Sequence, residues 1–227
     1  MNSEDIEKAR QAIETHFWGR TQAMVARLNE CSSITYGENG RAYFQIPLIH
    51  RDTSINGGIY KSATRRNAIS VNDTEDQVLF QYLVDFTNYI WGRGISRNEQ
   101  AILEECYHFI QKTIRTGDPE FPYSHIFSEQ IVPLGFYIIQ RLGDCRVQAL
   151  LACYLLEQLV LTSLLDAYIS FDRNNYSGFA HAWCRVTLAT TWTTFIIDPR
   201  RSFFGPLQRD NSDDSIWPYQ RPEDYIG

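Results

Sequence analysis

The sequence predicts an α+β fold in which a central helix is followed by an antiparallel sheet. Apolar residues recur at helical spacing in several stretches before about residue 160. After that point three β-prone runs follow one another, with polar turns between them. One helix followed by consecutive strands indicates an antiparallel meander rather than a parallel doubly wound sheet.

Residues 1–134 are predicted to form a helical lobe that carries a β-hairpin segment. Apolar spacing indicates a helix over residues 4–28. Residues 37–73 contain short β-prone runs that Asn-Gly and Gly-Gly steps interrupt. We expect one or two hairpins there, either as a small β element or as an elaborate loop over a cleft.

Two further helices are expected next, each with a capping-box pattern at its start. The first begins at Thr74, three residues before Gln77, and ends at the sequence WGRG. The second begins at Ser96, three residues before Glu99, and ends at the sequence TGDP. The two helices should form an antiparallel pair, and the aromatic, Pro-punctuated residues 118–133 should connect them to the rest of the chain.

Residues 135–227 are predicted to form a catalytic core that makes one compact unit with the lobe. Its helix runs from Arg146 to about residue 160, because Gly143 breaks the preceding segment and Asp144 is a good N-cap. The three β-prone runs cover residues 164–172, 179–189 and 192–199.

Composition limits the partners and the compartment. The 227 residues include 21 Lys and Arg against 27 Asp and Glu, so the formal net charge is -6. An acidic chain does not attract phosphate backbones or acidic lipid headgroups, so we expect no nucleic-acid and no membrane partner. The sequence has no apolar run near the roughly 18 residues of a membrane span, and it starts with charged rather than apolar residues. A cytoplasmic location is expected, in the protein's own cell or in a host.

The five cysteines do not resemble a disulfide framework, because their number is odd and their spacing is wide. A reducing compartment is therefore expected. No Cys-x-x-Cys pair and no His pair at metal-ligand spacing is present. The sequence predicts no metal site and no cofactor. The cysteines are Cys31, Cys106, Cys145, Cys153 and Cys184.

Cys145 is the candidate nucleophile, because it stands at the predicted start of the central helix. A thiolate needs a positive local field, and a helix N-terminus supplies one. The free backbone N–H groups of the first turn are also suited to bind a developing oxyanion. Cys31, Cys106, Cys153 and Cys184 are instead expected to be core residues.

His181 and Asp198 are the candidate base and orienting carboxylate. His181 lies in the sequence FAHAW of a predicted strand, between small residues that leave room for a helix to approach. Trp183 lies on the same strand face as His181 and is expected to shield the site from water. Asp198 ends the next predicted strand and is followed by Pro199, so its carboxylate is placed at a sheet edge to accept from the imidazole.

These three motifs resemble those of the transglutaminase-like branch of the papain-like cysteine enzymes. In that family Gly-x-Cys-x-x-x-Ala opens the central helix, His-Ala-Trp follows on the next strands, and Asp-Pro completes the triad. The matching sequences here are GDCRVQA, HAW and DP, with 36 residues from Cys145 to His181 and 17 from His181 to Asp198. The resemblance covers about residues 135–200. It implies a papain-like core, in which the nucleophile helix packs on an antiparallel sheet.

The resemblance implies further site residues. Papain-like enzymes usually have an oxyanion-hole residue five to six positions before the cysteine, where Gln140 is the candidate. Trp183 and His125 are candidates for lining the cleft. The chain lacks the Cys-x-x-Cys pairs of peptide N-glycanases and the carboxylate runs of calcium-dependent transglutaminases. Neither zinc nor calcium dependence is expected.

The function implied by the resemblance is amide acyl transfer on protein substrates through a thioester. Water as the acceptor makes a thiol protease or a glutamine deamidase, and a lysine amine makes a transglutaminase. Because the triad is the same in each, hydrolase and acyltransferase both stay open. The family includes bacterial effectors that enter host cells, and this chain is a candidate effector.

The residues before 135 match no motif of this family, and they are expected to recognise the substrate or to bind a regulatory protein partner. The alternative hypothesis is a catalytically silent transglutaminase-like module that binds proteins. In that case the residues before 135, with the aromatic sequences FPYSHIF and SFFGPLQ, would form the working surface.

Overall fold

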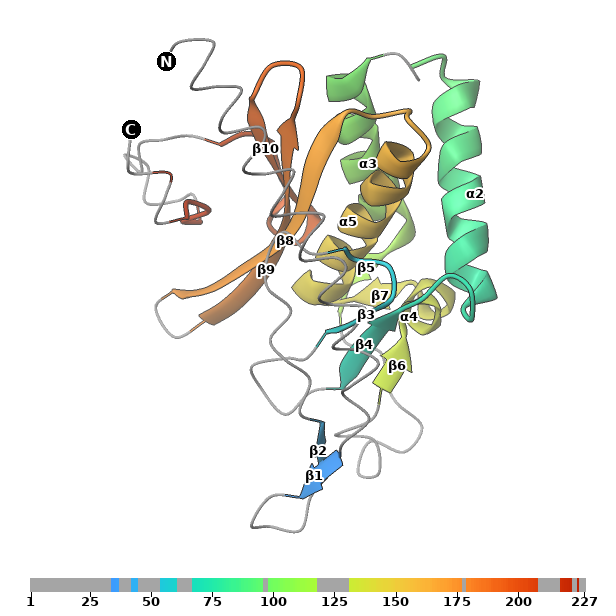
Figure 1. The fold of residues 1–227 in the computed structure, drawn as a ribbon, viewed down its shortest axis with the longest axis vertical. Coiled ribbons are helices and arrows are strands. Elements are labelled where there is room, and N and C mark those ends of the chain that lie inside the picture. The colour runs from blue at the N-terminus through green and yellow to red at the C-terminus, as the bar shows by residue number, and fades with distance from the viewer. Residues whose placement is uncertain are drawn as a thin grey trace.

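The computed structural model describes residues 54–60, 67–95, 98–117, 131–176, 179–207, 217–221 and 224, together with two short strands at 34–36 and 42–44. Over these residues the protein is α+β, as predicted, with helices on one side and the largest sheet on the other (Figure 1). The expected helix at 4–28 and the connecting residues 118–130, with His125, lie outside the described residues.

The helices within the described part have the following bounds: α2 (Gln77–Gly92), α3 (Glu99–Thr113), α4 (Leu134–Gln140) and α5 (Cys145–Leu161). The strands are β1 (Ile34–Tyr36), β2 (Ala42–Phe44), β3 (Gly58–Tyr60), β4 (Ala68–Val71), β5 (Arg115–Thr116), β6 (Ile131–Pro133), β7 (Leu142–Gly143), β8 (Ala167–Tyr176), β9 (Phe179–Leu188), β10 (Thr194–Asp198) and β11 (Phe203–Pro206). A short 3₁₀ helix, η1 (Pro199–Arg201), joins β10 to β11.

The largest sheet is the predicted antiparallel meander, with the strand order β11-β10-β9-β8. The sequence pattern predicted β8, β9 and β10, and β11 adds a fourth strand. Alternate residues of β9 point to opposite faces of the sheet. Ala182, Cys184 and Val186 belong to the core cluster that includes α5, whereas Trp183 belongs to a second cluster with Trp217 and Tyr219.

The helix α5 is buried on nearly all sides. The sheet, α3 and β4 all contact it, so apolar residues are required around its whole circumference. The core cluster also contains residues of β3, β4, α2 and α3. One continuous core therefore takes residues from both sides of position 135.

The N-terminal hairpin signals correspond to antiparallel strand pairs. β3 pairs with β4, and β1 pairs with β2. β6 then adds to β4 in parallel, which turns the β3–β4 pair into a three-stranded sheet. The helices α2 and α3 run in opposite directions beside each other, as predicted (Figure 1).

The predicted caps of α2 and α3 were wrong by two residues. Asp76 caps α2, because its carboxylate accepts a hydrogen bond from Leu79 N at 3.1 Å. The Thr74 hydroxyl instead donates to Asn72. Asn98 caps α3 by accepting from Ala101 N, and Ser96 lies outside the described residues. In both cases a side-chain acceptor nearer the first turn replaces the hydroxyl residue.

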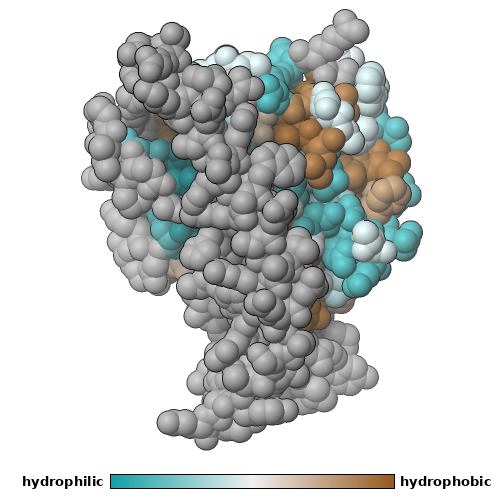
Figure 2. All heavy atoms as spheres, viewed as in Figure 1, coloured by the Kyte–Doolittle hydropathy of each residue, from teal (hydrophilic) through white to brown (hydrophobic). Residues whose placement is uncertain are grey.

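Some large apolar side chains are exposed on the helical side of the molecule. Phe80 and Trp91 on α2 and Leu161 at the end of α5 are about half exposed. Apolar residues gather over this region in the surface view (Figure 2). Among the helices of the described residues, none combines the length and apolar character that crossing a bilayer requires.

Gly135 allows α4 to pack against the start of α2, and its replacement should destabilise the protein. Its N–H donates to Asp76 at 2.6 Å, and an added Cβ would lie 2.1 Å from an Asp76 carboxylate oxygen. We expect Gly135→Ala to lower the free energy of unfolding by about 2 to 3 kcal/mol, because the α2 cap must move. Urea unfolding measures this.

Gly92 provides the control, since a Cβ there would meet nothing within 4 Å. Gly92→Ala at the end of α2 should be neutral or stabilising by less than about 1 kcal/mol. Equal destabilisation by the two variants would contradict the steric explanation.

Candidate active site

Cys145 is the first residue of α5, and Asp144 caps that helix as predicted. The Asp144 carboxylate accepts from Arg146 N at 2.9 Å and from Val147 N at 3.1 Å. Two of the N–H groups expected to be free are therefore used by the cap. In the part of the chain that the structure describes, no hydrogen bond engages the Cys145 N–H. It is the donor of the first turn that remains available to an oxyanion.

Gly143 is required by a close approach of the backbone to Val147, two residues before Cys145. An added Cβ would lie 2.5 Å from Cγ1 of Val147 and 2.7 Å from its Cβ. The segment is fixed there by β7, which pairs in parallel with β5, so that Gly143 lies opposite Thr116. Only a residue without a side chain fits, which gives the Gly-x-Cys sequence a steric reason.

His181 and Asp198 form a close buried pair. His181 Nε2 lies 2.5 Å from Asp198 Oδ2, and the two side chains are 7% and 1% exposed. β10 ends at Asp198, whereas β9 continues past it at the end where His181 lies. The end of the shorter strand thus places the carboxylate beside the imidazole of the longer one.

The Cys145 thiol is also a neighbour of His181. Burial lowers the pKa of His181, but hydrogen bonds and charge interactions with Asp198 and Cys145 outweigh burial and raise this pKa from 6.5 to about 9. Because Asp198 occupies Nε2, Nδ1 is the ring nitrogen that remains for the thiol. The structure therefore places the three predicted triad side chains next to one another, with a cationic imidazole at neutral pH.

Two residues near the C-terminus complete the surroundings of the pair. Trp217 meets the His181 ring edge-on, with centroids 4.9 Å apart, and the Tyr219 hydroxyl lies 2.8 Å from Asp198 Oδ2. Sequence reasoning missed both. The available signal was the sequence WPY at 217–219, two aromatic residues around a proline. We call residues 217–221 together with 224 the C-terminal strap.

The other predicted site residues have different placements. Gln140 ends α4 and is exposed, so its oxyanion role stays a prediction. Trp183 differs from the expectation for a cleft residue, because it is 2% exposed and packs against Ile196, Trp217 and Tyr219. Its ring centroid lies 6.1 Å from that of His181, so Trp183 lies beside the imidazole on its buried side.

The remaining described cysteines have core environments. Cys106, Cys153 and Cys184 are fully buried, whereas Cys145 is only partly buried. Burial raises the pKa of the Cys106 and Cys153 thiols well above the usual range. Among the described residues, Cys145 is thus the thiol that combines access with a basic partner.

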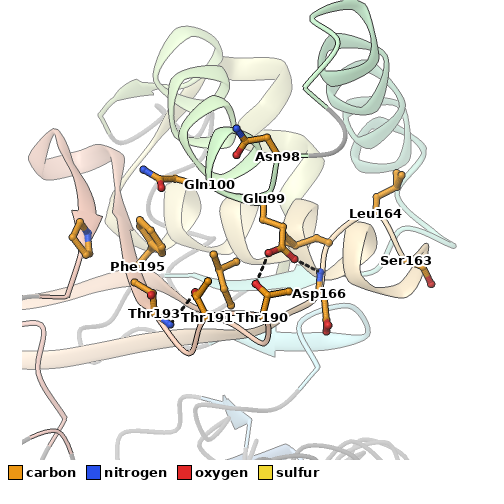
Figure 3. A pocket seen from close by; sticks show the side chains of 13 residues that line it. Asn98, Glu99, Gln100, Ser163, Leu164, Asp166, Thr190, Thr191, Thr193 and Phe195 are labelled. Carbon is orange, nitrogen blue, oxygen red and sulfur yellow. Dashed lines mark hydrogen bonds between the residues drawn. The ribbon is translucent and has the colours of Figure 1, made fainter.

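A concavity of about 860 Å³ lies away from the triad, between the start of α3 and the turn that joins β9 to β10. Its central carboxylate, Glu99, accepts from the Thr190 hydroxyl at 2.7 Å and from Asp166 N at 3.2 Å (Figure 3). The first bond fastens the β9–β10 turn to α3 and the second fastens the segment just before β8, so we assign the concavity a structural origin. The described residues contain no group of three His, Cys, Asp or Glu side chains able to hold a metal ion.

Comparisons with protein-family models, with curated protein sequences and with solved structures find no match to this chain.

Proposed function

We propose that this protein is a cysteine-dependent amide acyl-transfer enzyme that acts on protein substrates. The observation that carries the proposal is the buried His181–Asp198 pair at 2.5 Å, with Cys145 beside the imidazole at the start of α5. A cationic imidazole and a helix N-terminus both favour a cysteine thiolate. Cys145, His181 and Asp198 are the proposed nucleophile, acid–base group and orienting carboxylate.

The proposed reaction has two steps. The Cys145 thiolate attacks the carboxamide carbon, and the carbonyl oxygen becomes an oxyanion that accepts from the Cys145 N–H. The C–N bond then breaks as the His181 imidazolium gives its proton to the departing amine, which leaves a thioester. Water or a second amine next attacks the thioester and loses a proton to His181, and the thiolate departs.

The finer fold assignment, a papain-like or transglutaminase-like core, is part of this proposal. It is supported by α5 packing on the meander and by the order of the three residues along the chain. The acceptor class stays open among protease, glutamine deamidase and transglutaminase. The lobe before residue 135 is proposed to bind the substrate or a regulatory protein, and action in a cytosol as a bacterial effector belongs to the same proposal.

A protein substrate is favoured by the surface next to His181. Phe179, two residues earlier on the same strand face, is 72% exposed. An exposed aromatic side chain beside the proposed site is suited to contact an apolar residue of a polypeptide.

Thiol labelling and proteomics test the proposal. Under limiting iodoacetamide at pH 7, peptide mapping should find Cys145 alkylated at least about tenfold faster than Cys31 or Cys106, as its proposed role as the nucleophile requires. Cell lysate treated with wild type should then show cleavage, deamidation or cross-linking that Cys145→Ala does not produce.

The two measurements separate the hypotheses. If Cys145 is alkylated no faster than the other cysteines, the nucleophile assignment is wrong. Fast alkylation without any lysate product would favour the silent protein-binding module.

A further inference from the structure

We propose that Tyr219 is a positioning residue of the triad, whose phenol shares the Asp198 oxygen used by His181 and so sets how strongly the carboxylate holds the imidazolium. The inference rests on the proposed function and extends it to the C-terminal strap, which none of the sequence motifs indicated.

The buried Asp198 carboxylate has three hydrogen-bond donors around it. Oδ2 faces His181 Nε2 at 2.5 Å and accepts from the Tyr219 hydroxyl at 2.8 Å, while Oδ1 accepts from Arg201 N at 3.1 Å. Asp198 and Tyr219 are 1% and 3% exposed. Because the carboxylate is buried, each donor stabilises a larger part of its charge than it would at an exposed site.

Tyr219 is held in place by contacts on both sides. The Asn174 side chain on β8 accepts from Trp217 Nε1 at 2.8 Å and donates to Pro218 O at 2.7 Å. The Arg201 guanidinium lies 4.2 Å from the centre of the Trp217 ring. The Tyr219 ring itself packs on Phe203 and Trp183. The phenol is thus directed at Asp198 by a rigid, aromatic surrounding.

Two ion pairs fix the strap beyond Tyr219. Arg221 donates to Asp172 at 2.6 and 2.7 Å, and Arg185 forms a bidentate pair with Asp224 at 2.7 and 2.8 Å. Both partners, Asp172 on β8 and Arg185 on β9, are buried. Buried, bidentate geometry of this kind specifies position, because removing either charge leaves the other unpaired.

The phenol acts as a donor and not as an anion. Burial, together with the Asp198 charge, raises the pKa of Tyr219 well above the usual range. The other titratable groups that face Asp198 are His181 on β9 and Tyr107 on α3, whereas the Arg201 charge on η1 acts on Tyr219 and Cys145 on α5 faces His181. Among the described residues, Tyr219 is the phenol that donates a hydrogen bond to Asp198 Oδ2.

The test is the pH dependence of Cys145 alkylation by iodoacetamide, measured on the full chain from pH 5 to pH 10.5. In wild type the imidazolium should lose its proton near pH 9 and change the rate there. In Tyr219→Phe, Asp198 loses a donor and attracts the imidazolium proton more strongly. We expect this alkaline transition to move upward by about half a pH unit or more.

Tyr60→Phe is the matched control, since it also removes a buried phenol, which donates to Ile55 O at 3.0 Å and, among the described residues, forms no hydrogen bond with a triad side chain. Its alkaline transition should stay at the wild-type pH. An unchanged transition in Tyr219→Phe, or an equal shift in Tyr60→Phe, would overturn the inference. If wild type itself shows no fast Cys145 alkylation, the proposed function fails instead.

Discussion

Asp198→Asn should lower the rate of the proposed acyl transfer by about ten-thousandfold. An amide keeps the shape of the carboxylate but not its charge, and loss of the orienting charge in related triads has effects of this order. The Asp198 hydrogen bond and charge would then no longer offset burial, and only the interactions with Cys145 would still do so, so the pKa of the His181 imidazole should fall below about 9. The alkylation of Cys145 at pH 7.5 should slow as the imidazolium fraction falls.

Asp85→Asn is the control for Asp198→Asn, because Asp85 is an exposed carboxylate on α2 whose partner is Gln81. It should leave the alkylation rate unchanged. A loss of less than tenfold in Asp198→Asn would contradict the role of Asp198 as the orienting carboxylate.

The buried His181–Asp198 pair also predicts how the stability of the protein depends on pH. The folded pKa of His181, about 9, lies above its ordinary value of 6.5, so the folded state binds the proton more tightly. The resulting stabilisation is present below about pH 6.5 and is lost as the pH rises to 9. Urea unfolding at pH 6 and pH 9.5 should show this difference in wild type and much less of it in Asp198→Asn.

Glu157→Ala should have the largest effect on folding. Glu157 lies on α5 and is 4% exposed, and its carboxylate accepts from Ile55 N at 2.8 Å and from Asn56 N at 2.9 Å. Burial raises the pKa of Glu157, although the two backbone bonds oppose this. Removing the carboxylate leaves two buried or partly buried N–H groups without an acceptor. We expect a loss of about 3 kcal/mol in the free energy of unfolding.

Calorimetry should show this as a decrease in Tm of roughly 6 to 12 °C for a chain of this size. Glu104→Ala is the control, since Glu104 is about half exposed on α3 and its one ion-pair partner among the described residues is His108, at 3.9 Å. It should change the free energy of unfolding by less than about 0.5 kcal/mol. A decrease below 1 kcal/mol for Glu157→Ala would show that residues 54–57 find other acceptors.

Local patterns predicted the elements that carry the triad. Asp144 caps α5 because its side chain reaches the second and third N–H groups, a short-range property that sequence shows directly. The β9 run was predicted because its residues alternate between a small apolar face and a face with His181 and Trp183. The helix start and the strand together brought Cys145 and His181 into consideration.

Long-range partners were not predictable in the same way. Tyr219 meets Asp198 only because residues 217–221 cross the face of the sheet opposite α5, and no periodicity records that path. The short strands β5, β6 and β7 have two or three residues each, too few for a period of two to stand out. The prediction of the α2 cap was wrong for a related reason, since Asp76 also accepts a hydrogen bond from Gly135 N, which is 59 positions away in the sequence.

The strap also determines when the site is complete. During translation Cys145, His181 and Asp198 are synthesised in that order, and Trp217 and Tyr219 are synthesised after all three. Until those last residues have docked, Asp198 lacks one donor and the imidazole lacks its aromatic cover. The nascent chain thus forms α5 before His181 and Asp198 gain these contacts. The fast alkylation of Cys145 that the proposed function predicts should therefore require residues 217–221 to have docked.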